Sequence, residues 1–266
     1  MKSEVESAMS ELEHQAAIVT GGASGIGAAT AKRLAELGAA VTVADLDGTG
    51  AETVAAEIRR RGGRAMAVTA DVARYDDNQA MVKRTIETFG GVHIVFANAG
   101  IPEASTPLEE VSEEQIERLL NINLRGVIAL ARAVAPVFKG QRSGAFVATA
   151  STAGVRPRPG IQVYSATKGA VIAFVRALAL EWAPYGVRAC AVSPVATDTP
   201  MLPQFQAAAG SATNDAAAIT ESFRKTVPLG RLAKAEDIAE AVCFLVSERA
   251  RMMTGTILDV DGGRTI

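Results

Sequence analysis

The chain has 266 residues, of which 48% are hydrophobic and 21% are charged, and its formal net charge is -2. A chain of this length can bury a sizeable core as one α/β domain or as two small ones. It lacks the basic excess that nucleic-acid-binding proteins carry, so we expect no nucleic-acid partner.

Residues 1–14 are acidic and polar, unlike a signal sequence, and are predicted to form a flexible tail before a single domain over residues 15–266. No uninterrupted apolar stretch approaches the roughly 20 residues that a membrane helix needs, so no membrane association is expected. Cys190 and Cys243 lie in apolar runs, which favours reduced core thiols over a disulfide or a metal site. We therefore expect a cytoplasmic protein without a metal.

Short runs of small and β-branched apolar residues alternate along the chain with longer segments of helical periodicity. The predicted strands are 16–20, 40–45, 65–71, 92–98, 144–150, 187–193 and 256–260. The predicted helices are 25–37, 50–61, 76–89, 112–138, 164–183 and 235–247. This alternation is typical of βα units, and nearly continuous apolar strands are typical of sheets covered on both faces. We predict an α/β fold with a Rossmann-type, doubly wound parallel sheet of seven strands.

A glycine-rich turn joins the first predicted strand to the first predicted helix, with the spacing Gly-x-x-x-Gly-x-Gly at Gly21, Gly25 and Gly27. Glycines let the backbone approach a pyrophosphate, and the helix N-terminus presents free N–H groups and a partial positive charge. The motif alone leaves open a glycine-rich turn without a ligand.

Asp45 ends the second predicted strand, where a carboxylate can accept hydrogen bonds from the adenosine ribose and repel a 2′-phosphate. Neither Ser24 in the glycine turn nor Leu46 is basic, so no residue there would hold a 2′-phosphate. NAD is therefore favoured over NADP. The alternative role for Asp45 is a helix N-cap, which does not compete with ribose binding.

Tyr164 and Lys168 are four residues apart in a predicted helix, so they lie on one face of it. A nearby ammonium and a positively charged nicotinamide both favour the phenolate, which could then exchange a proton with a substrate hydroxyl. Ser151, at the end of the fifth predicted strand, could hold the substrate oxygen. The alternative is a surface tyrosine with a neighbouring lysine, but both Ser151 and Tyr164 are expected at the same sheet edge as the glycine turn.

Together these residues resemble the short-chain dehydrogenases/reductases in their compact form, from about Gln15 to Gly263. The matching motif residues are Thr20, Gly21, Gly25, Gly27, Asp71-Val72, Asn98-Ala99-Gly100, Asn123, Ser151, Tyr164 and Lys168. The resemblance implies cofactor contacts at Gly21, Ser24, Gly25, Ile26, Gly27, Asp45, Leu46, Asp71, Val72, Asn98, Ala99, Gly100, Tyr164, Lys168, Pro194 and Thr199.

The resemblance also implies roles for the catalytic residues. Tyr164 is the general acid/base, Ser151 orients the substrate oxygen, and Lys168 lowers the pKa of Tyr164 and binds the nicotinamide ribose. Asn123 holds a water that leads from Lys168 to solvent, and Thr199 contacts the carboxamide. A homotetramer is implied as well, in which the helices 112–138 and 164–183 and the final helix and strand contact partner copies.

Three positions depart from the family pattern. Val195 stands where a glycine is usual after the sixth strand, so either its φ stays negative or the nicotinamide pocket is reshaped. Ala97 replaces an asparagine, a common variation that leaves Asn98 available. His93 replaces an aspartate and is interpreted as a structural residue rather than a catalyst. These departures concern cofactor affinity more than the type of reaction.

The remaining signals bear on the substrate. Residues 200–228, rich in Ala, Pro and Gln, are predicted to cover the ligand site, with Met201, Leu202 and Phe205 as an apolar inner face. This favours an at least partly apolar substrate, such as a cyclic or secondary alcohol. Arg156 and Arg158 could meet an anionic substrate, although a solvated loop is preferred for them. Trp182 and Phe174 are interpreted as core or interface residues.

We thus predict an NAD(H)-dependent oxidoreductase that interconverts a secondary alcohol and a ketone by hydride transfer, with Tyr164 passing the proton. Two alternatives stay open. An NAD-using epimerase or dehydratase is disfavoured by the glycine spacing and by the absence of a large C-terminal domain. A noncatalytic NAD-binding sensor or scaffold has no need for the full set of Asn123, Ser151, Tyr164 and Lys168.

Overall fold

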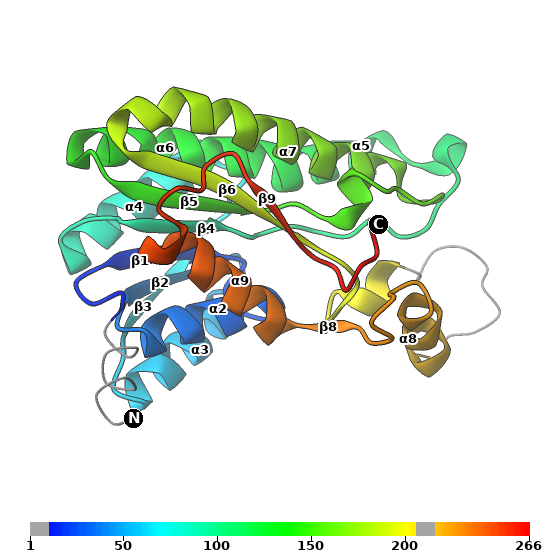
Figure 1. Cartoon of the computed structure of the whole chain (residues 1–266), viewed down its shortest axis with the longest axis horizontal. Helices are drawn as coiled ribbons and strands as arrows, with labels where there is room; N and C mark the ends of the chain where they lie inside the picture. Colours follow the sequence, from blue (N-terminus) through cyan, green and yellow to red (C-terminus); the bar gives the residue numbers. More distant parts are fainter. Residues whose placement is uncertain (1–10, 206–215) are drawn as a thin grey trace.

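The computed structural model describes residues 11–205 and 216–266, and its centre is a parallel sheet (Figure 1). The sheet has seven strands in the order β3-β2-β1-β4-β5-β6-β9. Their bounds are Ala16–Thr20 (β1), Ala40–Asp45 (β2), Arg64–Thr69 (β3), Ile94–Ala97 (β4), Gly144–Thr149 (β5), Val187–Pro194 (β6) and Ile257–Val260 (β9). The order reverses between β1 and β4, which creates the crevice where doubly wound sheets bind ligands. The predicted fold class is confirmed.

Helices cover both faces of this sheet (Figure 1). One layer contains α2 (Gly25–Glu36), α3 (Gly48–Arg60) and α9 (Ala235–Val246). The other contains α4 (Tyr75–Phe89), α6 (Gly126–Gln141) and α7 (Gln162–Trp182), preceded by the short α5 (Glu113–Leu120). The remaining helix, α8 (Ala216–Arg224), belongs to neither layer and lies at the end of the molecule near the C-terminus (Figure 1).

The strands are apolar throughout because successive side chains enter different cores. Ala17 and Val19 of β1 pack in the core under α2, α3 and α9, whereas Ile18 packs in the core under α4, α6 and α7. In the second core, the buried Trp182 meets Phe138 and Phe146 edge-on, with ring centroids 5.9 and 5.8 Å away. Such pairs add about 0.5–1.5 kcal/mol beyond area burial. The interpretation of Trp182 as a core residue is confirmed.

Two helical stretches, Glu113–Gln141 and Gln162–Tyr185, are long and apolar enough by length and composition to cross a bilayer. Each nevertheless places one face against the sheet, where Val134 and Val175 are fully buried in the second core. Buried core helices of globular proteins meet the same criteria, so these stretches are weak evidence for membrane insertion.

The predicted helix 112–138 is divided in the structure. Ser112 and Gln115 form a capping box that starts α5, and a π-helical turn at Asn121–Arg125 separates α5 from α6. A π-turn inserts an extra residue into the helical repeat, and such turns are frequent at functional sites. Asn123 lies within it.

The end of the predicted tail is packed rather than loose. Leu12 is fully buried, and its N–H donates a hydrogen bond to the Leu37 carbonyl at 2.8 Å. The packed domain therefore includes residues 11–14, four residues earlier than predicted, because Leu12 fills the core beside α2. Residues 1–10 and 206–215 of the predicted tail and insertion lie outside the described residues.

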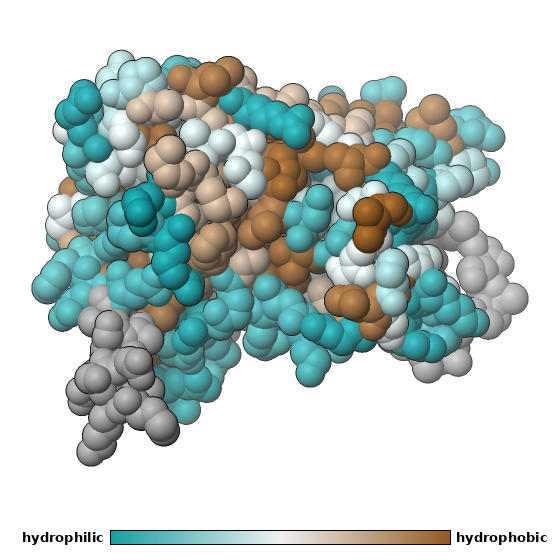
Figure 2. All heavy atoms as spheres, viewed as in Figure 1, coloured by the Kyte–Doolittle hydropathy of each residue, from teal (hydrophilic) through white to brown (hydrophobic). Residues whose placement is uncertain are grey.

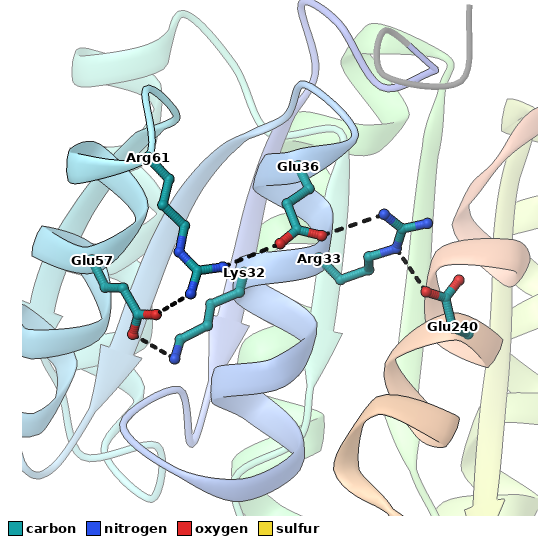
Figure 3. Close-up of polar contacts among 6 residues, drawn as sticks. All are labelled: Lys32, Arg33, Glu36, Glu57, Arg61 and Glu240. Carbon is teal, nitrogen blue, oxygen red and sulfur yellow. Dashed lines mark hydrogen bonds and ion pairs between the residues drawn. The ribbon is translucent and has the colours of Figure 1, made fainter. Parts of the chain in front are cut away.

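Ion pairs join the helices of the first layer at the surface (Figure 3). Glu57 of α3 lies 2.5 Å from Lys32 and 2.7 Å from Arg61, and Arg33 of α2 lies 2.7 Å from Glu240 of α9. Such partly exposed pairs contribute only about 0–1 kcal/mol each. They connect α2 to α3 and α9, while the apolar core supplies most of the stability.

Candidate active site

A pocket of about 610 Å³ opens at the carboxyl ends of the parallel strands. Of the sixteen predicted cofactor residues, fifteen line this pocket, and the exception is Gly27. Ser151, Tyr164 and Lys168 line it as well, whereas Asn123 does not. The topology therefore brings the glycine turn, Asp45 and the Tyr/Lys pair to one cavity, as the sequence predicted.

The glycine turn is shaped by close backbone contacts. Gly21 and Gly25 have φ of 64° and 52°, in the left-handed region that favours glycine. A Cβ on Gly27 would lie only 2.0 Å from the Gly21 carbonyl oxygen, so no side chain fits there. Gly27 thus packs the start of α2 against the turn, which explains why it stays outside the pocket.

Asp45 holds the glycine turn against the end of β2. Its Oδ2 accepts a hydrogen bond from Ala23 N and its Oδ1 accepts one from Asp47 N, both at 3.0 Å. The N-cap of α3 is Asp47, which accepts from Gly50 N, so the alternative role considered for Asp45 is wrong. The carboxylate of Asp45 still lines the pocket and has lone pairs left for a ribose.

A chain of hydrogen bonds joins the glycine turn to Lys168. Asn98 Nδ2 donates to the carbonyls of Thr20 (3.1 Å) and Gly21 (3.3 Å), and Asn98 Oδ1 accepts from Thr149 Oγ1 at 3.1 Å. The Thr149 carbonyl in turn accepts from Lys168 Nζ at 2.7 Å. The side chain of Asn98 thus links β1, β4 and β5 where all three end.

Burial shifts the pKa values of the central pair in opposite directions, because it disfavours the charged form of each group. It raises the pKa of Tyr164 to about 12, although a hydrogen bond with Ser151 acts in the other direction. Desolvation also lowers the pKa of Lys168 to about 8. Lys168 Nζ lies 5.7 Å from the centroid of the Tyr164 ring. Without a ligand the phenol is therefore neutral near pH 7.

Asn123 lies beneath the pocket wall. Its Oδ1 accepts from Ile101 N at 2.8 Å, and its Nδ2 donates to the Ile101 carbonyl at 2.9 Å. A Cβ on Gly100 would lie 3.1 Å from Asn123 Oδ1 and 3.7 Å from Lys168 Nζ. Gly100 therefore lets the π-turn approach the lysine, and the side chain of Asn123 is bound to backbone.

Glu103 is a buried carboxylate that sequence reasoning missed. Its Oε2 accepts from Tyr164 N at 2.6 Å, which satisfies a free N–H in the first turn of α7. Its Oε1 is buried without a hydrogen-bond partner among the described residues. Desolvation raises the pKa of Glu103, while hydrogen bonds from the backbone of Tyr164 and Val163 oppose this shift. Glu103 thus fixes the backbone that carries Tyr164.

The segment after β6 covers the pocket with apolar side chains. Met201, Leu202 and Phe205 line the cavity, and the ring of Phe205 meets Tyr164 edge-on with centroids 5.1 Å apart. Two short strands, β7 (Thr197–Asp198) and β8 (Ala233–Lys234), flank the insertion 200–228 and pair with each other. The prediction of an apolar inner face is confirmed for these three residues.

Three arginines also line the pocket. Arg156 is exposed and donates to the carbonyls of Arg264 and Ile266. Arg158 is half-buried, donates to the Phe205 carbonyl at 3.4 Å and lies over the Phe223 ring at 5.4 Å. Burial lowers the pKa of Arg158, so the preferred interpretation of a solvated loop is wrong for this residue.

Two departures from the family pattern prove structural. Among the described residues, only His14 and Arg142 combine a side chain with a positive φ, so Val195 keeps an ordinary backbone conformation. Val195 is buried in the first core and also lines the pocket. His93 Nδ1 accepts from Ala16 N at 3.0 Å, and burial lowers the pKa of His93. The structural interpretation of His93 is confirmed.

Further residues near the carboxyl ends of the strands belong to no motif, and of these Arg264 and Thr149 line the pocket whereas Glu103 does not. Glu103 follows β4 and Arg264 follows β9 at the same edge of the sheet as the known motifs. Position after a strand was the available signal for both. Thr149, the last residue of β5, could have been found in the same way because it directly precedes the segment of Ser151.

Comparison with known proteins agrees with this geometry. The chain matches a family model described as enoyl-(acyl carrier protein) reductase over residues 21–265. It is 45% identical over 255 residues to 4-formylbenzenesulfonate dehydrogenase of Comamonas testosteroni, covering 96% of this chain and 99% of that protein. The chain belongs to the short-chain dehydrogenase/reductase family.

Other members of the short-chain dehydrogenase/reductase family are similar over the same length. Cis-4-hydroxycyclohexanecarboxylate dehydrogenase of Sinomonas cyclohexanicum is 39% identical over 253 residues, or 94% of this chain and 96% of that protein. The crystal structure of a 3-ketoacyl-(acyl-carrier-protein) reductase from Brucella melitensis, complexed with NADH, superposes with a TM-score of 0.88. It is 41% identical and covers 96% of this chain and 100% of its own.

The raised pKa of Glu103 predicts a pH-dependent stability. Between the unfolded value of 4.5 and the raised folded value, the native protein binds a proton that the unfolded chain releases, so stability falls as pH rises. Glu103→Gln lacks this titration. We expect the unfolding free energy of the wild type to fall relative to that of Glu103→Gln as pH rises from about 4 to 7. Urea unfolding at several pH values measures it.

Glu109→Gln, at an exposed position of the same segment, controls for the loss of one carboxylate. A difference for Glu103→Gln that does not change with pH would show that the buried carboxylate does not titrate in this window.

Proposed function

We propose that this protein is an NAD(H)-dependent dehydrogenase that interconverts a ring alcohol and its ketone. The observation that carries the proposal is the convergence of the glycine turn, Asp45 and the buried Tyr164 and Lys168 on one pocket. A turn that binds phosphate supplies no chemistry by itself, and a Tyr/Lys pair moves only protons. One cavity containing both has the parts for coupled hydride and proton transfer.

The pocket fits a dinucleotide. The turn around Gly21 leaves no space for side chains and opens onto the N-terminus of α2, an arrangement suited to a pyrophosphate. Asp45 would accept hydrogen bonds from the adenosine ribose and disfavour a 2′-phosphate, which supports NAD over NADP. Lys168 would donate to the nicotinamide ribose, and Thr199, which lies against Gly25, would contact the carboxamide. When bound, NAD supplies the hydride acceptor.

Tyr164 would move the proton in this reaction. For alcohol oxidation its Oη must accept the hydroxyl proton, so the phenolate is the active form, and the pKa of about 12 must fall. The ammonium of Lys168 favours that fall, since a nearby positive charge stabilises a phenolate. Ser151 would orient the substrate oxygen, and Asn123 in the π-turn would hold a water between Lys168 and solvent.

The apolar cover supports a ring substrate. Phe205, Met201 and Leu202 present carbon atoms to the cavity beside Tyr164. Two of the relatives carry names of ring substrates, a formylbenzenesulfonate and a hydroxycyclohexanecarboxylate. We therefore propose a cyclic secondary alcohol as the substrate class, with the free thiols of Cys190 and Cys243 supporting a reducing, cytoplasmic location.

We also propose a homotetramer, as the family resemblance implies. Leu180 on α7 is 81% exposed, and Ile128 on α6 is partly exposed in the single chain. Figure 2 shows mainly apolar residues across the middle of the face along which β9 runs in Figure 1. Both surfaces would be covered by partner copies.

Tyr164→Phe tests the acid/base role. We expect kcat/KM for cyclohexanol oxidation to fall about 10²- to 10⁴-fold, while the Kd for NADH stays nearly unchanged. In the wild type the rate should rise with pH, because deprotonation makes the phenol competent, and this rise should be lost in Tyr164→Phe. Tyr185→Phe, which removes a hydroxyl outside the pocket, is the matched control. Undiminished turnover by Tyr164→Phe would refute the assignment.

Asp45→Asn tests cofactor choice. The wild type should bind NADH more tightly than NADPH. The substitution should lower the ratio of the Kd for NADPH to the Kd for NADH by about tenfold, because one charge that repels the 2′-phosphate is removed. Fluorescence titration measures both constants. Asp47→Asn removes the same charge next to the site but outside the pocket, and its ratio should match the wild type. A wild type that prefers NADPH would contradict the role of Asp45.

The assembly is tested by the mass in solution. Native mass spectrometry should give about 110 kDa, four times the chain mass of 27.6 kDa. Leu180→Asp should reduce this mass, since a charge would enter the contact between α7 helices. A wild type of 27.6 kDa would refute the tetramer.

A further inference from the structure

Arg158 is a half-buried cation in the wall of the pocket. Of its five N–H donors, one contacts the Phe205 carbonyl at 3.4 Å. No carboxylate of the described residues forms an ion pair with it, and burial, which lowers the pKa of Arg158, is the sole cause of that shift. Other arginines of the chain, such as Arg33 and Arg61, have glutamate partners instead.

Arg158 is connected through Phe205 to Tyr164 at the other end of the pocket wall. Phe205 packs its ring against Tyr164, and its carbonyl accepts a hydrogen bond from Arg158. The guanidinium also lies over the Phe223 ring, whose centroid is 5.4 Å from Arg158 Cζ. Phe205 therefore contacts both the guanidinium and the phenol ring. A ring-sized substrate with its hydroxyl at Tyr164 would extend along this apolar wall towards Arg158.

We propose that Arg158 is a specificity-determining residue that binds an anionic group, a carboxylate or a sulfonate, on the ring of the substrate. This inference rests on the proposed function, since it assigns the far end of the same substrate. A planar guanidinium binds such groups through two parallel hydrogen bonds, and its partial desolvation strengthens them. The substrate class becomes an amphiphilic anion: an apolar ring with a hydroxyl at one end and a negative charge at the other.

Arg158 is better suited to this role than the two other arginines of the pocket. Arg156 is exposed, and its guanidinium is engaged by the carbonyls of Arg264 and Ile266. Arg264 lies near Arg156 and Asp261, and both affect its pKa after the larger contribution of desolvation. Of the three arginines, Arg158 is the one that contacts Phe205 and Phe223 within residues 11–205 and 216–266. Arg156 and Arg264 add positive potential at the rim, which would attract an anion.

The test compares substrates that differ in one charge. The wild type, Arg158→Met and Arg158→Lys are assayed with NAD on cis-4-hydroxycyclohexanecarboxylate, its methyl ester and cyclohexanol. Arg60→Met, an exposed substitution on α3 outside the pocket, controls for the loss of one positive charge. In parallel, titration calorimetry measures the Kd of the unreactive cyclohexanecarboxylate for each protein in the presence of NADH.

We expect the wild type to prefer the carboxylate over the ester by at least about tenfold in kcat/KM. Arg158→Met should lose about 10- to 100-fold on the carboxylate, mainly through KM, and little on cyclohexanol. Arg158→Lys should retain part of the preference, because the charge remains without the planar pair of donors. Arg60→Met should behave as the wild type.

Other outcomes separate this inference from the proposed function. Equal turnover of carboxylate and ester by the wild type, or a preference that survives in Arg158→Met, would overturn the role of Arg158 and leave the dehydrogenase assignment intact. Failure of every alcohol to react would refute the proposed function. Calorimetry then tests the anion site alone. Arg158→Met should raise the Kd of cyclohexanecarboxylate at least about tenfold, and an unchanged Kd would overturn the inference.

Discussion

The candidate active site depends on the hydrogen-bonded chain that runs from the Gly21 carbonyl through Asn98 and Thr149 to Lys168. Gly21 and Asn98 directly follow β1 and β4, and Thr149 ends β5, so the register of the parallel sheet sets the distance between the glycine turn and the α7 helix. The amide of Asn98 can make these contacts because it carries donors and an acceptor on one side chain. A buried network of this kind favours one arrangement, since any slip would leave polar groups unsatisfied.

Around this network the protein retains buried ionisable groups that stability alone would not favour. Burial of Lys168 and Glu103 opposes their charged forms, and neither has an ion-pair partner among the described residues. Both act on the same helix: Glu103 contacts its first turn, and Lys168 joins its second turn to Thr149. Such costs are typical of sites arranged for function. Together these two contacts connect the two turns of α7 that carry Tyr164 and Lys168 to Glu103 and to the end of β5.

The predicted elements succeeded where local signals agreed with the global fold. The strands β1 and β2 match their predicted bounds, because apolar runs between turn residues are fixed by burial on both faces. The division of the helix 112–138 was not predicted, because the segments on both sides of the π-turn are helical and a π-turn is defined by backbone hydrogen bonds, which have no residue signature. Leu12 was missed because Glu11 and Glu13 flank it in a segment interpreted as an acidic, polar tail. Glu103 was missed because its partner is a backbone N–H, which has no sequence signature.

The two halves of the pocket follow different rules. Motif residues surround the nucleotide half, where Gly21, Gly25 and Asp45 each meet a constraint that few residue types satisfy. The substrate half is built by the cover and the loop after β5, where many combinations of side chains can form a wall. Family membership therefore specifies the reaction class, whereas the substrate must be inferred from physical features such as a half-buried guanidinium beside aromatic rings. The family motif of this chain thus carries information about its reaction, and its pocket wall carries independent information about its substrate.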